Sequence, residues 1–232
     1  MLLVLLSSCR FGAPPGDTLQ GQKIGNLYHL MFYIAIAVAA VVYLLILWCI
    51  VRYRRRSDDL PPQFRYHIPL EVTYTVIPIL IVVGIFVATF RTEDRVDAVA
   101  AHPSLVVNVT AFMWQWRFQY PVQHVQIVGT PQTPPTLVVP VGKTVRINLS
   151  SSDVNHAFFV PDFLFKRDAI PGFENHFDLN LTQVGTFIGE CAEFCGLNHS
   201  AMDFYVRSVP PSQFQSALRQ AARKQSAAQG TS

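Results

Sequence analysis

Two cysteines, a histidine and a methionine lie close together in the C-terminal part of the chain. Cys191, Cys195, His199 and Met202 fall within one short segment, and a second histidine, His156, lies upstream. Thiolate and thioether sulfurs are the ligands that soft copper ions prefer, and neutral imidazole nitrogens also suit copper. These residue types therefore predict a copper site assembled from two separate segments.

The two cysteines also fit a second interpretation, a disulfide in an exported domain. A disulfide requires neither His199 nor Met202, and zinc sites rarely include methionine. Copper is the favoured interpretation, and the disulfide stays open as its alternative.

The pattern Cys191-x-Glu193-x-Cys195-Gly-x-Asn-His199, with Met202 after it, resembles subunit II of the bacterial haem-copper cytochrome c oxidases. Other segments carry the same resemblance across most of the chain: His156 with the following Val160-Pro161, the segment 166–172 (Lys-Arg-Asp-Ala-Ile-Pro-Gly), and the aromatic pair Trp114-Gln115-Trp116.

The resemblance implies a dinuclear copper A centre. The two cysteine sulfurs would bridge both coppers, with His156 and Met202 completing one ion and His199 and the backbone carbonyl of Glu193 completing the other. The residues themselves point the same way, because a one-copper blue site uses a single cysteine and this segment has two. By the same resemblance, the Glu193 side chain would help to hold a magnesium ion shared with the catalytic subunit I.

Electron entry would involve an aromatic residue and nearby carboxylates. Trp114 and Trp116 alternate along a predicted strand and would share one face, for which core packing is the ordinary interpretation. The resemblance instead makes Trp114 the exposed aromatic through which cytochrome c delivers its electron. Asp153, Asp162 and Asp178 would supply an acidic docking surface for a basic haem protein.

Two apolar runs predict a transmembrane hairpin. Residues 28–51 and 72–90 are long enough to cross a hydrocarbon core of about 30 Å. The loop 52–70 between them holds five arginines and two aspartates, which predicts a cytoplasmic loop and an exported C-terminal domain. Glu71 heads the second run; the resemblance implies the entrance of a proton pathway, and a carboxylate that stabilises the helix N-terminus is the alternative.

Residues 1–27 predict a signal segment and an exported N-terminal stretch. The sequence Leu6-Ser7-Ser8-Cys9 resembles a bacterial lipoprotein cleavage site, which implies lipidation of Cys9. No positively charged region precedes the short apolar run, as it would in an ordinary signal peptide.

From residue 91 the pattern changes to short alternating runs separated by Pro and Gly, which predicts an all-β domain over 91–209. The expected strands cover residues 105–110, 113–120, 136–140, 144–150, 176–181, 186–190 and 203–208. Their number and spacing fit a sandwich or Greek-key barrel, and the resemblance makes it a cupredoxin-like fold. Residues 210–232 predict a polar tail, beginning as a short helix from Ser212 and fraying into disorder.

These features together predict the electron-entry subunit of a cytochrome c oxidase in the bacterial plasma membrane, with subunits I and III, cytochrome c and lipid as partners. Residues 103–209 contain six basic and eight acidic residues without a basic stripe, so nucleic acid is not an expected partner. The chain lacks a Cys-x-x-Cys-His haem attachment motif, so oxygen reduction would occur in another subunit. A quinol oxidase subunit II and a membrane-tethered copper-binding module stay as alternatives.

Overall fold

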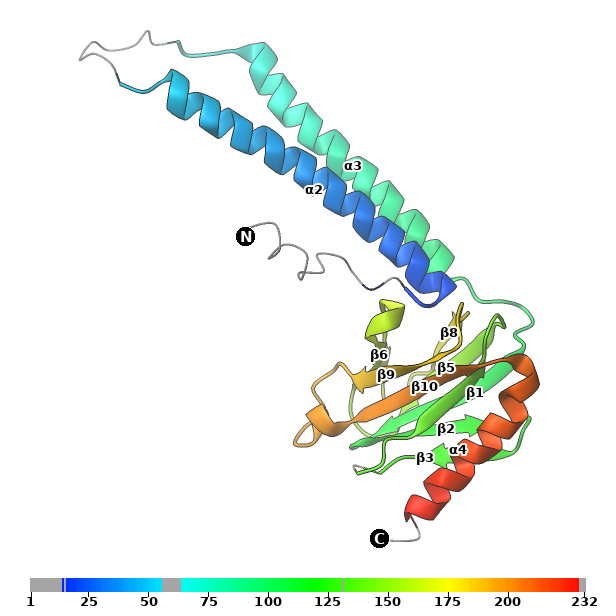
Figure 1. Cartoon of the computed structure of the whole chain (residues 1–232). Helices are drawn as coiled ribbons and strands as arrows, with labels where there is room; N and C mark the ends of the chain where they lie inside the picture. Colours follow the sequence, from blue (N-terminus) through cyan, green and yellow to red (C-terminus); the bar gives the residue numbers. More distant parts are fainter. Residues whose placement is uncertain (1–13, 15, 56–63, 131, 230–232) are drawn as a thin grey trace, which may run out of the picture. The chain divides into compact units, whose positions relative to one another are not determined.

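The computed structural model describes residues 14, 16–55, 64–130 and 132–229 (Figure 1). The chain divides into two compact units, Asn26–Asp94 and a second made of Met1–Gly25 with Arg95–Ser232. The first contains most of two long helices, and the second is a β domain with one C-terminal helix.

The two long helices are α2 (Leu19–Arg52) and α3 (Ile68–Asp97), of 34 and 30 residues. Each exceeds the length that a hydrocarbon core of about 30 Å requires at about 1.5 Å per residue. Their most apolar segments are not buried within the chain. Both helices are therefore long and apolar enough to span a membrane, and both extend beyond the predicted runs.

The start of α2 belongs to the β domain. Thr18 is fully buried, pairs with Leu181, and accepts a hydrogen bond from the Gly21 amide at 2.8 Å, which caps the helix. A Cβ at Gly21 would lie 2.3 Å from the carbonyl oxygen of Phe163, so only glycine fits there. The segment before the membrane helix is thus anchored to the β domain.

Two five-stranded sheets form the β domain around one hydrophobic core. The first has the order β3 (Val125–Val128), β2 (Gln115–Tyr120), β1 (Leu105–Phe112), β5 (Val145–Ser151), β8 (Asn175–Leu179). The second has the order β4 (Thr136–Pro140), β10 (Asp203–Val209), β9 (Gly185–Cys191), β6 (His156–Val160), β7 (Phe165–Ala169). All seven of these expected strands are present within a few residues, and β6 is the Phe-rich strand that begins at His156, whereas β3 and β7 were not expected.

Aromatic side chains occupy the centre of the core. The ring centroid of Phe204 lies 4.7 Å from that of Phe158, 5.1 Å from Trp116 and 5.8 Å from Phe118, and all four residues are fully buried. Such tilted and edge-on pairs add to the free energy gained by burying the rings. This cluster supports the strands that carry the predicted copper ligands.

The helix expected from Ser212 is present as α4 (Phe214–Gln229), but it continues to Gln229 rather than fraying. It contacts β3 and β4 and buries Phe214 and Leu218. The side-chain amide of Gln225 also donates a hydrogen bond to the carbonyl of Thr133 at 3.1 Å. The amphipathic spacing of a few apolar residues fixes this otherwise polar helix to the domain.

We expect Phe204→Ala to lower the free energy of unfolding of the β domain by about 3–5 kcal/mol, because it leaves a cavity among three buried rings. Phe173→Ala is the matched control, because Phe173 is 57% exposed, and should change stability by less than about 0.5 kcal/mol. Urea titration of the full chain in detergent, followed by tryptophan fluorescence, measures both. Equal effects of the two substitutions would contradict the assignment of Phe204 to the core.

Candidate metal centre

The predicted copper segment is the loop between two hydrogen-bonded strands. β9 ends at Cys191 and β10 begins at Asp203, which pairs with Glu190. The amide of Cys191 donates a hydrogen bond to the carbonyl of Met202 at 3.2 Å. The first and last sulfur-bearing residues of the loop are therefore held next to each other.

His156 reaches the same place from the neighbouring strand. It is the first residue of β6, which pairs with β9 so that Phe158 lies opposite Cys191. The Ala192 amide continues this contact by donating to the carbonyl of Ala157 at 3.2 Å. Strand pairing brings together ligand candidates that are 35 positions apart in sequence.

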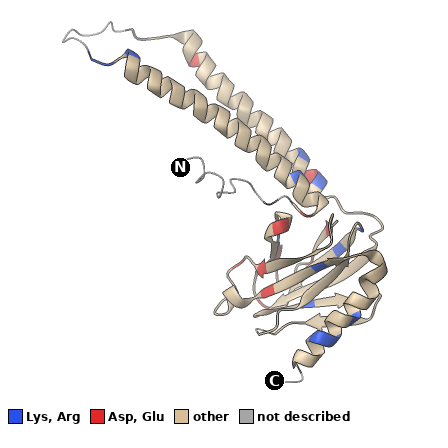
Figure 2. Cartoon of the chain, in the orientation of Figure 1, with Lys and Arg blue, Asp and Glu red and all other residues tan. Residues whose placement is uncertain are grey.

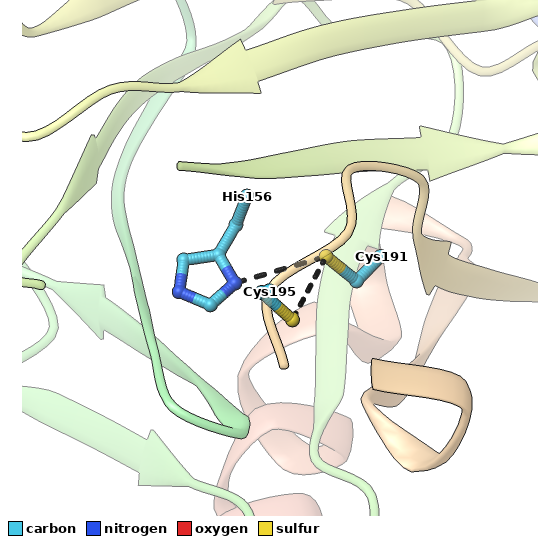
Figure 3. A group of neighbouring side chains, drawn as sticks. All are labelled: His156, Cys191 and Cys195. Atoms are coloured by element: carbon cyan, nitrogen blue, oxygen red, sulfur yellow. Dashed lines mark hydrogen bonds between the residues drawn. The ribbon is translucent and has the colours of Figure 1, made fainter. Parts of the chain in front are cut away.

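Three of the predicted ligands, His156, Cys191 and Cys195, form one cluster (Figure 3). The sulfur of Cys191 lies 3.7 Å from Nδ1 of His156, 3.3 Å from the carbonyl oxygen of Glu193 and 3.9 Å from the sulfur of Cys195. The sulfur of Cys195 in turn lies 3.5 Å from Nδ1 of His199 and 3.8 Å from the thioether sulfur of Met202. The two cysteines are free thiols in this structure and do not form the alternative disulfide.

Burial isolates this cluster from solvent. His156 and Met202 are fully buried, Cys191 and Cys195 are 6% and 5% exposed, and His199 is partly exposed. Thiols, thioether and imidazole are thus gathered in an apolar setting, next to the aromatic core.

The environment of the two thiols separates their acidities. Burial favours the neutral thiol, but hydrogen bonding with His156 and with backbone groups outweighs it and lowers the pKa of Cys191 to about 7. Burial and the neighbouring Cys191 charge raise the pKa of Cys195. One thiolate is therefore available near neutral pH, whereas the second proton leaves readily only when a cation replaces it.

The donor set fits copper. Two sulfurs 3.9 Å apart can both contact one ion, because a metal–sulfur bond of about 2.3 Å exceeds half of that separation. The set combines thiolate, thioether and imidazole, and this soft combination favours copper over zinc, calcium or magnesium.

Comparison with known proteins identifies the chain's relatives. The sequence families described as cytochrome C oxidase subunit II, periplasmic domain, and cytochrome C oxidase subunit II, transmembrane domain, match residues 123–209 and 7–92. A protein of Streptomyces avermitilis named "Probable cytochrome c oxidase subunit 2" is 36% identical over 93% of this chain and 80% of its own length. Cytochrome c oxidase subunit 2 of Mycobacterium bovis is 32% identical over 94% of this chain and 78% of its own length.

The chain belongs to the cytochrome c oxidase subunit 2 family.

A solved structure agrees with this assignment. The periplasmic domain of subunit II of cytochrome oxidase from Bradyrhizobium japonicum matches 55% of this chain and 99% of its own length, with 30% identity and a TM-score of 0.50. The predicted fold, two transmembrane helices followed by a cupredoxin-like β domain, is confirmed. The chain is a membrane protein and an electron-entry subunit of a haem-copper oxidase, and neither the quinol oxidase nor the separate copper module is favoured.

Asp153 directly contacts His156, one of the clustered copper-ligand candidates. Its Oδ1 lies 2.9 Å from Nε2 of His156, leaving Nδ1 of that ring facing Cys191. Its Oδ2 accepts a hydrogen bond from the Met113 amide at 2.6 Å. The Asp153 carboxylate, which was predicted for docking, therefore has internal partners on both oxygens and orients the ring of His156. Its place three residues before His156 in the sequence was a signal for the contact between them.

Both tryptophans of the aromatic pair donate hydrogen bonds to the copper loop. Nε1 of Trp114 donates to the carbonyl of Cys195 at 3.0 Å, and Nε1 of Trp116 donates to the carbonyl of Met202 at 3.2 Å. Trp116 is fully buried, but Trp114 precedes β2 and is only partly buried. The expectation that they alternate on one strand is wrong, and the role of Trp116 in bracing the loop was not predicted.

Glu193 divides its functional groups between two environments. Its carbonyl faces the sulfur of Cys191, whereas its carboxylate lies 3.3 Å from the ammonium of Lys166. Lys166 also approaches Asp168 at 3.4 Å. The predicted magnesium ligand Glu193 is thus paired with the Lys166 ammonium. The sequence spacing of the two residues gave no sign of this pair.

The remaining predicted site residues lie outside the cluster. Asp178 is 3% exposed and forms an ion pair with Arg146, so its carboxylate is not presented to a docking partner and the expected surface role is corrected. Asp162 lies in the short helix η1 (Pro161–Phe163) and is partly exposed. The Glu71 carboxylate accepts a hydrogen bond from the His67 amide at 3.2 Å, as the helix-capping alternative expects. Cys9 lies outside the described residues.

We expect Asp153→Ala to weaken copper binding by about 10–100-fold, because loss of a carboxylate partner frees the ring of a histidine ligand. Glu174→Ala is the control, since its exposed carboxylate contacts only His176. Competition with a calibrated copper chelator, using the full chain in detergent, measures both affinities. Unchanged affinity of Asp153→Ala would show that the ring of His156 is positioned by other contacts.

Proposed function

We propose that the β domain holds two copper ions in a copper A centre and that the chain takes electrons from cytochrome c and passes them to haem in subunit I. The observation that carries this proposal is the cluster of two free thiols, a thioether and the His199 imidazole of the β9–β10 loop with the His156 imidazole of β6. Copper bound there would supply one-electron redox chemistry.

The arrangement of the terminal donors supports two ions rather than one. In the pair predicted for one ion, His156 lies beside the sulfur of Cys191 and Met202 beside that of Cys195. In the pair predicted for the other, the Glu193 carbonyl lies beside Cys191 and His199 beside Cys195. Each pair therefore offers one donor next to each sulfur, as bridging sulfurs require.

The protein's own contribution is to keep these donors in place in both oxidation states. Asp153 fixes the ring of His156, and the two tryptophans fix the loop carbonyls of Cys195 and Met202. A preorganised site on paired strands loses little free energy to rearrangement when its charge changes. The low exposure of the sulfurs keeps water from competing for the metal.

Trp114 supports the proposed route of electron entry. It is partly exposed, and its indole nitrogen contacts the carbonyl of Cys195, so one side chain joins the protein surface to the copper loop. Asp153 and Asp162 are the predicted docking carboxylates that keep partial exposure, and we propose them as the acidic part of the docking site.

Further parts of the proposal concern the wider assembly. The arginines between the two helices favour placing the β domain on the outer face of the bacterial plasma membrane. The chain would then consist of four segments, residues 1–27, 28–90, 91–209 and 210–232. We also propose subunit III as a partner and a lipid anchor on Cys9. Glu193 is proposed as a magnesium ligand shared with subunit I, which requires Lys166 to release it, and Glu71 as a proton entrance.

The copper stoichiometry of the full chain tests the two-ion proposal. We expect two coppers per chain and a mixed-valence paramagnetic signal shared between two nuclei. Cys195→Ser should abolish this signal because one bridge is lost, whereas Met202→Leu should keep both coppers with a shifted potential, because axial thioethers bind weakly. One copper per chain, or an unchanged spectrum in Cys195→Ser, would refute the two-ion centre.

Electron entry is tested separately in the assembled oxidase. Trp114→Phe keeps a ring but removes the hydrogen bond to Cys195, and we expect reduction by cytochrome c to slow by more than about tenfold. Copper content should stay unchanged, and Phe173→Ala, an exposed aromatic elsewhere on the domain, should reduce at the wild-type rate. Stopped-flow absorbance measures both rates. A wild-type rate in Trp114→Phe would place electron entry at another residue.

A further inference from the structure

Four basic side chains gather on one side of the β domain, around the C-terminal helix. Arg219, Arg223 and Lys224 are exposed on α4, and Arg207 lies on the adjoining strand β10. The sequence contains no Asp or Glu after Asp203. In Figure 2, α4 carries blue segments and no red one. The remainder of the β domain is rich in acidic residues, so this side has its own electrostatic character.

In the part of the chain that the structure describes, none of these four cations forms an ion pair with a carboxylate. Among the described residues, each ion pair of the β domain involves other cations, such as Arg146 with Asp178 and Arg167 with Asp97. The guanidinium of Arg207 instead donates a hydrogen bond to the side-chain carbonyl of Gln220 at 3.4 Å, which joins β10 to α4. The positive potential of this surface is therefore not compensated from within.

Two hollows follow the same surface. One, of about 730 Å³, runs along α4 beside Arg219 and Arg223. The other, of about 700 Å³, lies between α4 and the sheet and adds hydroxyl groups of Thr136, Thr186 and Tyr205. Gln220 and Lys224 line both hollows, so the two hollows are neighbours. The combined groove offers hydroxyl, amide and cationic donors along its length.

The groove is rigid because its helix is fixed to the core. The ring of Phe214 packs against that of Tyr120 at 6.4 Å between centroids, and Leu218 is fully buried. Arg219 and Arg223 are four positions apart on α4 and therefore project from the same side. Cations held at fixed spacing lose less conformational entropy on binding than cations on a mobile tail.

We propose that this basic groove, defined by Arg207, Arg219, Arg223 and Lys224, binds an acidic segment of another protein. Its long axis runs about 18 Å from Ser212, just before α4, along this helix to Lys224, which accommodates about five or six residues of extended chain. Hydroxyl and amide donors between the cations suit peptide carbonyls as well as carboxylates. The groove shares no residue with the copper cluster, so it is independent of electron entry and adds a second docking surface of opposite charge.

Fluorescence anisotropy of the full chain in uncharged detergent tests this proposal. The probe is a labelled peptide of about six residues rich in Asp and Glu, with its Asn and Gln counterpart as the neutral control. We expect binding of the acidic peptide only, weakening as salt rises. The triple variant R219Q/R223Q/K224Q should weaken it by about tenfold or more, whereas Lys143→Gln, an exposed cation away from the groove, should have less than about a twofold effect.

Charge reversal separates recognition from a merely structural role. The variant R219E/R223E should lose the acidic peptide and gain a Lys-rich one, while the thermal unfolding midpoint stays near that of the wild type. Equal binding of the neutral peptide, an equal effect of Lys143→Gln, or no binding at all would overturn the proposal. So would displacement of the bound peptide by tripolyphosphate or by phosphatidylglycerol in the micelle at lower concentration than the unlabelled acidic peptide, since the occupant would then be a phosphate or a lipid.

Discussion

The pairing of β9 with β10 is the constraint on which the metal centre depends. Because Asp203 lies opposite Glu190 and the Cys191 amide bonds to the carbonyl of Met202, the loop between these strands must return to its starting point. A closed loop places its two sulfur-bearing ends together before any metal binds. The adjacent pairing of β6 then adds His156, so backbone hydrogen bonds of one sheet fix the main dimensions of the cluster.

The metal ligands of the site could be predicted from sequence more completely than the residues that hold those ligands in position. Cysteine, histidine and methionine at close spacing have few other uses, and long apolar runs have a length that membranes impose. The contacts of Trp116 and Lys166 could not be predicted, because each depends on which strands become neighbours. The contact of Asp153 is local, and its place three residues before His156 was a signal for it. Strand β7 was missed because three consecutive charged residues resemble a loop.

The three carboxylates expected at the surface show how one residue type serves different purposes. Asp178 is buried and pairs with the partly exposed Arg146, Asp153 orients a histidine, and Asp162 keeps partial contact with solvent. A buried carboxylate without a partner would cost several kcal/mol, so burial itself forces the internal pairing. Acidic residues near a redox site therefore divide between holding the site and meeting its partners, and the surrounding fold decides which role each takes.

Helix α4 also has a consequence for solubility. It contacts β3 and β4, each of which is one of the two edge strands of its sheet. Unpaired edges offer free backbone groups to any other extended chain and are ordinary starting points for aggregation. One helix laid against both edges acts as a cover for the open side of the sandwich. The C-terminal segment, which its composition predicts to be a fraying polar tail, thus protects the domain against self-association.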